Sequence, residues 1–96
     1  MKLPACTSNN SLLEGDIETA SQRETITHLE VLETENGLCV AIEIKLEPGK
    51  IWYITTRRNR EEPKYYADLT RLSKHLNTLA PGVDFVLRRN PKIPKS

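Results

Sequence analysis

The sequence predicts an α+β fold in which a three-stranded antiparallel meander is followed by one helix, packed on one face, and a short fourth strand (β-β-β-α-β). Three observations support this: alternation of large apolar residues with smaller or polar ones over 38–46, turn signals on both sides of that segment, and a tyrosine and four leucines at helical spacing over 65–79. The 96 residues suit one domain, placed at 25–89 between a mostly disordered acidic leader (1–24) and a basic C-terminal tail (90–96).

Three segments have the composition of β-strands. Residues 25–34 are rich in β-branched side chains, residues 38–46 alternate, and residues 51–57 combine β-branched and aromatic side chains. Asn36-Gly37 is typical of a type I′ hairpin turn, whose two central positions both require positive φ. Pro48-Gly49 fits the centre of a type II turn. Together the segments and turns predict the meander.

The helix is predicted to begin at Pro63, because proline suits the first helical position and Glu61 and Glu62 favour the positive end of the helix dipole. Its apolar stripe consists of Tyr65, Leu69, Leu72, Leu76 and Leu79. Residues 83–89 alternate again and predict the fourth strand. Since the helix returns the chain to the starting end of the sheet, this strand should run parallel to the third.

The leader carries few apolar residues. Beyond Met1 and Leu3 at its start, only Leu12, Leu13 and Ile17 are large and apolar in residues 1–24, and three such side chains do not stabilise an isolated helix. We therefore expect most of the leader to be disordered. The sheet face that carries Cys39 and Ala41 is accordingly expected to stay open, without a large second core.

Charge is divided unevenly along the chain. Residues 1–49 hold three basic and nine acidic side chains, a net charge of −6, whereas residues 50–96 hold eleven basic and four acidic, a net charge of +7. Such a division indicates an anionic partner for the second half, or pairing of one half with the other within the fold.

Arginines follow the third and fourth strands where each strand ends. Parallel strands end at the same edge of a sheet, so we expect these arginines to cluster there, beside the N-terminus of the helix. Arginine binds phosphate or carboxylate through two parallel hydrogen bonds. The candidate anion- or nucleic-acid-binding residues are Arg57, Arg58, Arg60, Lys64, Arg88 and Arg89. The alternative is a solvated loop whose arginines pair with Glu61, Glu62 and the acidic leader.

Aromatic residues in the third strand suggest a second surface. Ile51 and Tyr53 point to one side of the strand and Trp52 and Ile54 to the other, so one pair faces away from the helix. We take Trp52 and Ile54 as a candidate interaction face that could stack a base or dock a partner. The alternative is that such a pair is covered by the leader or by a second subunit.

No residue pattern indicates catalysis, and we expect no enzyme activity, cofactor or metal. His28 and His75 have no partner at catalytic spacing, and neither a phosphate-binding glycine loop nor a nucleophile motif is present. Two cysteines, Cys6 and Cys39, cannot complete a four-ligand zinc site and are expected to be reduced thiols. With no membrane-spanning stretch and no secretory signal in the sequence, we expect a cytoplasmic protein.

These observations predict a small non-enzymatic accessory or regulatory protein that binds nucleic-acid phosphate through its arginine-rich sheet edge. Binding would be electrostatic positioning, because no set of base-reading side chains is evident. The alternative is a protein–protein interaction module, which either binds an acidic partner or forms a homodimer through an exposed strand edge and the Trp52 face. A titration against oligonucleotides at low and high salt separates the two.

Overall fold

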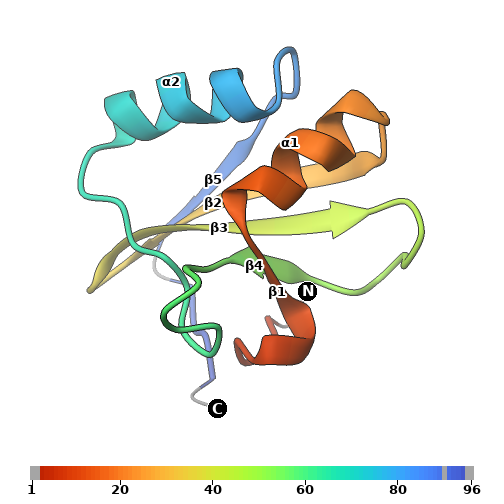
Figure 1. The fold of residues 1–96 in the computed structure, drawn as a ribbon. Helices are drawn as coiled ribbons and strands as arrows, with labels where there is room; N and C mark the ends of the chain where they lie inside the picture. Colours follow the sequence, from red (N-terminus) through yellow and green to blue (C-terminus); the bar gives the residue numbers. More distant parts are fainter. Residues whose placement is uncertain (1–2, 90, 95–96) are drawn as a thin grey trace.

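A computed structural model describes residues 3–89 and 91–94 of the chain (Figure 1). The elements in chain order are the 3-10 helix η1 (Ser8–Asn10), β1 (Ser11–Leu12), α1 (Glu14–Gln22), β2 (Ile26–Thr34), β3 (Gly37–Ile44), β4 (Trp52–Ile54), α2 (Leu69–Leu79) and β5 (Val86–Arg89).

The strands form one mixed sheet in the order β1-β4-β3-β2-β5. The meander is confirmed: β2 pairs with β3 and β3 with β4, both antiparallel. The two outer strands are parallel to their neighbours, β1 to β4 and β5 to β2. The predicted α+β class is therefore correct, but a meander with one helix is not, because the described residues contain five strands and two helices.

The additional strand and helix come from the segment predicted to be a mostly disordered leader. α1 begins after Leu13, whose backbone N–H donates to Asp16 Oδ2 at 2.8 Å. Ile17, in the middle of α1, is fully buried in the core. Three apolar side chains are too few for an isolated helix, but packing against a sheet supplies the stabilisation that local sequence lacks. The expectation of disorder is wrong for the part of the leader that the structure describes.

The second helix begins later than predicted. Asp68 caps α2, its Oδ1 accepting hydrogen bonds from the N–H groups of Thr70 and Arg71. The segment before it is extended rather than helical, because Tyr66 exchanges two backbone hydrogen bonds with Leu38 at 2.7 and 2.8 Å. Pro63 thus lies in a connecting segment. Of the predicted stripe, Leu72, Leu76 and Leu79 are buried in α2, while Leu69 is partly exposed and Tyr65 precedes the helix.

The hairpin between β2 and β3 turns one residue earlier than predicted. Thr34 pairs with Gly37, so Glu35 and Asn36 occupy the central positions. Of the turn residues only Gly37 has positive φ (128°), which excludes a type I′ turn. A Cβ at Gly37 would lie 3.1 Å from the carbonyl oxygen of Tyr66. The lack of a side chain at Gly37 therefore also lets the extended segment around Tyr66 pack closely against the turn. The second turn is as predicted: Gly49 has φ 85° and Lys50 N–H donates to the Glu47 carbonyl.

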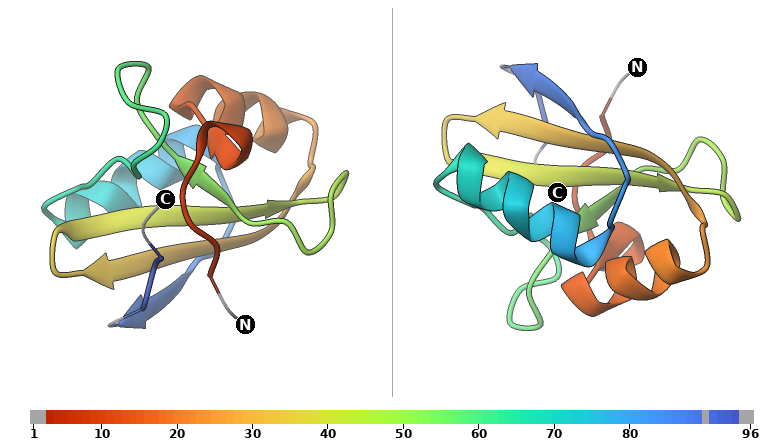
Figure 2. Two further views of the ribbon diagram at one scale, coloured as in Figure 1. Left: turned by 90° about the horizontal axis from the view of Figure 1, so that it is seen from below. Right: turned by 90° about the horizontal axis from the view of Figure 1, so that it is seen from above.

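Both helices lie on one face of the sheet (Figures 1 and 2). They cover the main core, which includes Ile17, Val31, Val40 and Leu72. The opposite face is not open as expected. There Cys39, Ala41 and Tyr53 are buried beneath the N-terminal segment, with Leu3 and Cys6 packed against them. Tyr53 also donates its hydroxyl proton to the carbonyl of Pro4 at 2.7 Å. The chain ends therefore build a second, smaller core.

Candidate anion-binding surface

The six predicted cationic residues do not form one cluster. β4 and β5 run in the same direction, as predicted, because β3 is antiparallel to β4 and to β2, and β2 is parallel to β5. However, β3 and β2 lie between them, so their ends are about 14 Å apart across the sheet. The arginines that follow β4 and those in β5 occupy the same end of the sheet but separate positions.

The two arginines of β5 are paired with acidic side chains of β2. Arg88 Nη2 donates to Glu30 Oε1 at 2.8 Å, and Glu30 is only 6% exposed. Arg89 Nε lies 4.0 Å from Glu33 Oε1, at a more exposed position. The Arg88 guanidinium compensates the buried negative charge of the Glu30 carboxylate, which gives Arg88 a structural role.

Arg60 is also used within the fold. Its Nε donates to Ser11 Oγ at 2.7 Å and its Nη2 to the Ser11 carbonyl at 2.9 Å. Ser11 and Thr55 are both buried and hydrogen-bonded to each other through their hydroxyls. Arg60 thereby fastens the loop after β4 to β1. No local pattern in the sequence signals this contact, which spans 49 positions.

Lys64 belongs to a cluster around Glu14, the first residue of α1. Glu14 Oε2 accepts hydrogen bonds from Tyr66 Oη at 2.6 Å and Lys64 Nζ at 3.1 Å, and lies 2.7 Å from His75 Nε2. Partial burial raises the pKa of the Glu14 carboxyl, but the hydrogen bonds from Tyr66, His75 and Lys64 outweigh it and lower the pKa to about 2. Burial and the bond to Glu14 raise the pKa of Tyr66. This cluster joins α1, α2 and the connecting segment.

The lowered pKa of Glu14 predicts a loss of stability in acid. Its stabilising contribution is present above about pH 4.5, the ordinary pKa of this carboxyl, and is lost as pH falls towards 2. We expect Glu14→Gln to lower the free energy of unfolding at pH 7 by roughly 1–3 kcal/mol and to flatten its pH dependence between about pH 5 and 2. Urea unfolding at a series of pH values measures both. Glu18→Gln, exposed on the same helix, is the control; an unchanged pH dependence in Glu14→Gln would contradict the assignment.

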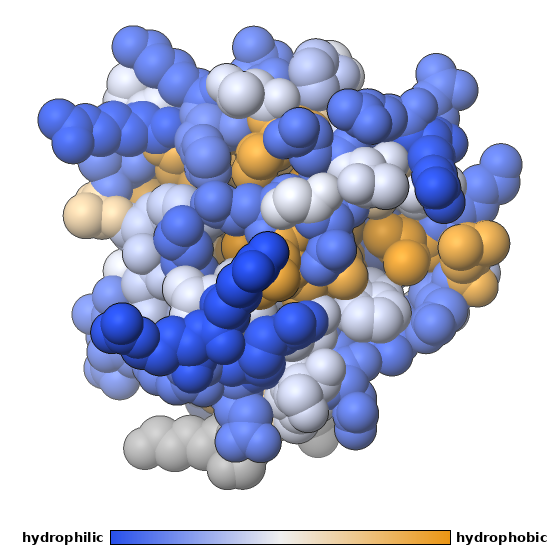
Figure 3. Space-filling model, viewed as in Figure 1, coloured by the Kyte–Doolittle hydropathy of each residue, from blue (hydrophilic) through white to orange (hydrophobic). Residues whose placement is uncertain are grey.

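Arg57 and Arg58 differ from the other predicted arginines, Arg60, Arg88 and Arg89. Both are exposed in the loop after β4, and neither has an acidic partner within 4.0 Å among the described residues. Glu61 and Glu62 do not pair with them; Glu62 instead accepts from Asn59 Nδ2. On the face shown in Figure 3, strongly hydrophilic residues are concentrated around this loop, which lies below α1 in the same view of Figure 1.

A hollow of about 350 Å3 lies beside Arg57, where the β1–α1 junction meets the loop after β4. Because β1 is parallel to β4, the N-terminus of α1 begins at the end of the sheet where β4 stops. The helix end predicted beside Lys64 is therefore that of α1, not of α2. The residues that line the hollow are Leu13, Glu14, Gly15, Asp16, Thr55, Thr56, Arg57 and Lys64.

The predicted interaction face is not exposed as a unit. Trp52 and Ile54 point towards the helices, and Ile54 is fully buried in the main core. Trp52 packs against the same core, and Lys50 Nζ lies 3.9 Å from the centroid of its ring. The other pair, Ile51 and Tyr53, is the one that faces away from the helices, and the N-terminal segment covers it. Ile54 therefore cannot belong to an interaction face.

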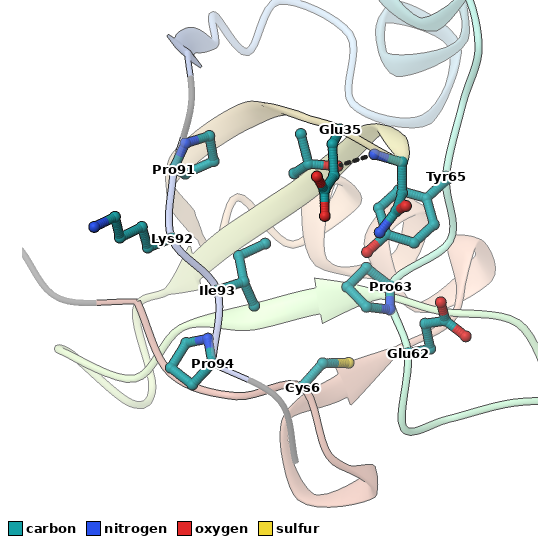
Figure 4. A pocket seen from close by; sticks show the side chains of 11 residues that line it. Cys6, Glu35, Glu62, Pro63, Tyr65, Pro91, Lys92, Ile93 and Pro94 are labelled. Atoms are coloured by element: carbon teal, nitrogen blue, oxygen red, sulfur yellow. Dashed lines mark hydrogen bonds between the residues drawn. The ribbon is translucent and has the colours of Figure 1, made fainter.

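A larger hollow, of about 630 Å3, lies on the other side of the sheet between the β2–β3 turn, residues 62–65 and residues 91–94 (Figure 4). Its lining combines three prolines, Ile93 and Tyr65 with five polar or charged residues, and the Cys6 thiol lies at its edge. Burial raises the pKa of Cys6 to about 11 and that of Cys39 to about 12, so both thiols are poor nucleophiles. In residues 3–89 and 91–94, no three His, Cys, Asp or Glu side chains are grouped so as to hold a metal ion.

Comparisons with known protein families, with curated proteins and with solved structures find no match to this chain. Neither helix of the described residues has the length and apolarity needed to cross a membrane.

Proposed function

We propose that this chain is a non-enzymatic binding module that contacts nucleic-acid phosphate through Arg57 and Arg58, with Lys64 in support. The observation that carries the proposal is that these two adjacent arginines are exposed and lack an acidic partner among the described residues. An unpaired guanidinium keeps all its donors for a ligand, whereas Arg60 and Arg88 are engaged within the fold.

The surroundings of the two arginines suit a phosphate backbone. The side chain of Thr56 is exposed between them and β4, and Lys64 at the rim of the hollow retains donors beyond its bond to Glu14. The carboxylates of Glu14 and Asp16 line the same hollow, but each already accepts hydrogen bonds from the protein. Such a surface positions a nucleic acid by charge and carries no base-reading set, so affinity should depend steeply on salt.

The double substitution Arg57→Gln/Arg58→Gln tests the proposal. We expect weaker binding to duplex and single-stranded oligonucleotides at low salt, with a salt slope lower by up to about 0.9 per lost phosphate contact on duplex. Because both side chains are exposed, the free energy of unfolding should change by less than about 1 kcal/mol. Fluorescence anisotropy at several salt concentrations measures the affinity.

The matched control is Arg23→Gln/Lys45→Gln, which removes two exposed charges at the opposite end of the sheet, next to the start of β2 and the end of β3. Its affinity should stay within about twofold of the parent if Arg57 and Arg58 form the contact surface. Equal losses in the two double variants would indicate binding through overall charge alone. A parent that binds no oligonucleotide at low salt would overturn the proposal outright.

A further inference from the structure

The four-residue strand β5 forms an open edge of the sheet that is long enough to pair with another strand. β5 is the last strand in the sheet and pairs only with β2, while the opposite edge is the two-residue strand β1. In both views of Figure 2, β5 lies at the rim of the sheet. No described strand or bridge pairs with its outer side. Open edges present unpaired backbone donors and acceptors, and proteins commonly protect them with charge or coverage.

The side chains along this edge follow a pattern that is complementary to itself. Val83, Phe85 and Leu87 pack against the helix-covered core. The alternate residues lie on the other face: Asp84 is exposed, Val86 is 53% exposed, and Arg88 reaches Glu30. Asp84 lies two residues before β5, so residues 84, 86 and 88 present a negative charge, an apolar side chain and a positive charge at equal spacing.

We propose that a second copy of this chain pairs antiparallel with β5, with Val86 directly opposite Val86 of the copy on a two-fold axis. In that register Asp84 faces Arg88 of the second copy, and the symmetry repeats this pair on the other side of the axis. Phe85 would face Leu87 of the second copy on the opposite side of the strand. The result is a continuous ten-stranded sheet with all helices on one face.

The charged groups needed for this pairing are available. Asp84 makes no hydrogen bond or ion pair with the described residues. Arg88 contacts Glu30 through Nη2 alone, and a guanidinium offers five N–H donors. Sliding the copy by two residues in either direction would set Val86 against Arg88 or Asp84 instead. Charge complementarity thus selects one register, and opposite charges facing each other across strands are favourable.

The oligomeric state tests the proposal first. Sedimentation equilibrium of the parent at about 100 μM should give twice the chain mass of 11.0 kDa. The dimer of Val86→Lys should have a dissociation constant at least about tenfold higher than that of the parent, because the substitution places two lysines opposite each other on the two-fold axis. Leu46→Lys is the matched control: Leu46 is 81% exposed in the β3–β4 turn, and this variant should retain the parent mass. Circular dichroism checks that both variants fold.

Cysteine cross-linking tests the register. In Val86→Cys the two introduced thiols would be opposite each other, with Cα atoms about 4.5–5.5 Å apart, which suits a disulfide. In Asp84→Cys they would be about 14 Å apart along the strands and should not cross-link. The native thiols are buried and interfere little. A monomeric parent, an unchanged mass for Val86→Lys, or equal cross-linking of the two cysteine variants would each overturn the proposal. None of these measurements involves nucleic acid, so they succeed or fail independently of the proposed function.

Discussion

Ile17→Ala should lower the free energy of unfolding by about 2–4 kcal/mol, the range observed when a buried isoleucine is truncated and the cavity cannot fully collapse. Ile17 is fully buried between α1 and the sheet, in contact with the main core. The loss would demonstrate that the N-terminal quarter of the chain is part of the folded domain. Chemical denaturation followed by circular dichroism and tryptophan fluorescence measures it.

The control for Ile17→Ala is Leu46→Ala, which removes an apolar side chain that is already exposed to water. That variant should change the free energy of unfolding by less than about 0.5 kcal/mol. A loss of under about 1 kcal/mol for Ile17→Ala would mean that α1 does not pack on the sheet. The N-terminal segment would then be the flexible leader that its composition suggests.

Leu72→Ala should have an effect of similar size, about 2–4 kcal/mol. Leu72 is 1% exposed and is the first of the three buried leucines of α2, ahead of Leu76 and Leu79. Its truncation leaves a cavity in the main core between α2 and the sheet. Thermal and urea unfolding give the free energy difference.

Leu69→Ala provides an internal comparison, since Leu69 belongs to the same sequence stripe but is 37% exposed at the first turn of α2. It should cost clearly less than Leu72→Ala. Equal effects at the two positions would show that α2 is rotated or extended relative to the structure described above.

The elements that could be predicted are those with a repeated local pattern. From Leu38 to Ile44, β3 alternates large apolar side chains with smaller or polar ones, and Leu72, Leu76 and Leu79 have helical spacing. Such periodicity, together with the flanking turn signals, predicts both elements. The start of α2 was misplaced because Pro63 and Asp68 are both valid start signals. The choice between them depends on the hydrogen bonds of Tyr66 with Leu38, which join residues distant in sequence.

The position of the arginines could not be predicted for a related reason. The outer side of β4 is occupied by β1, so β5 adds to the free side of β2 instead. That arrangement follows from the N-terminal residues, in which Leu12 and Ile17 give too weak a local signal for a strand and a helix. Because the leader is predicted to be disordered, the sequence places β5 next to β4 and the four arginines in one cluster. In the structure β3 and β2 lie between these strands and separate Arg88 and Arg89 from Arg57 and Arg58.

The pairing of β1 with β4 also bears on how this chain reaches its native state. Ser11 aligns with Tyr53, and Glu30 with Val86. Each outer strand therefore pairs with a strand more than forty positions away in the sequence. Closing such long loops costs chain entropy before any contact forms in return, which slows folding. Only the central meander can assemble from neighbouring residues. We therefore expect this small domain to fold on the millisecond-to-second scale of sheet-rich proteins rather than in microseconds, with both flanks of the meander left uncovered until the chain ends arrive.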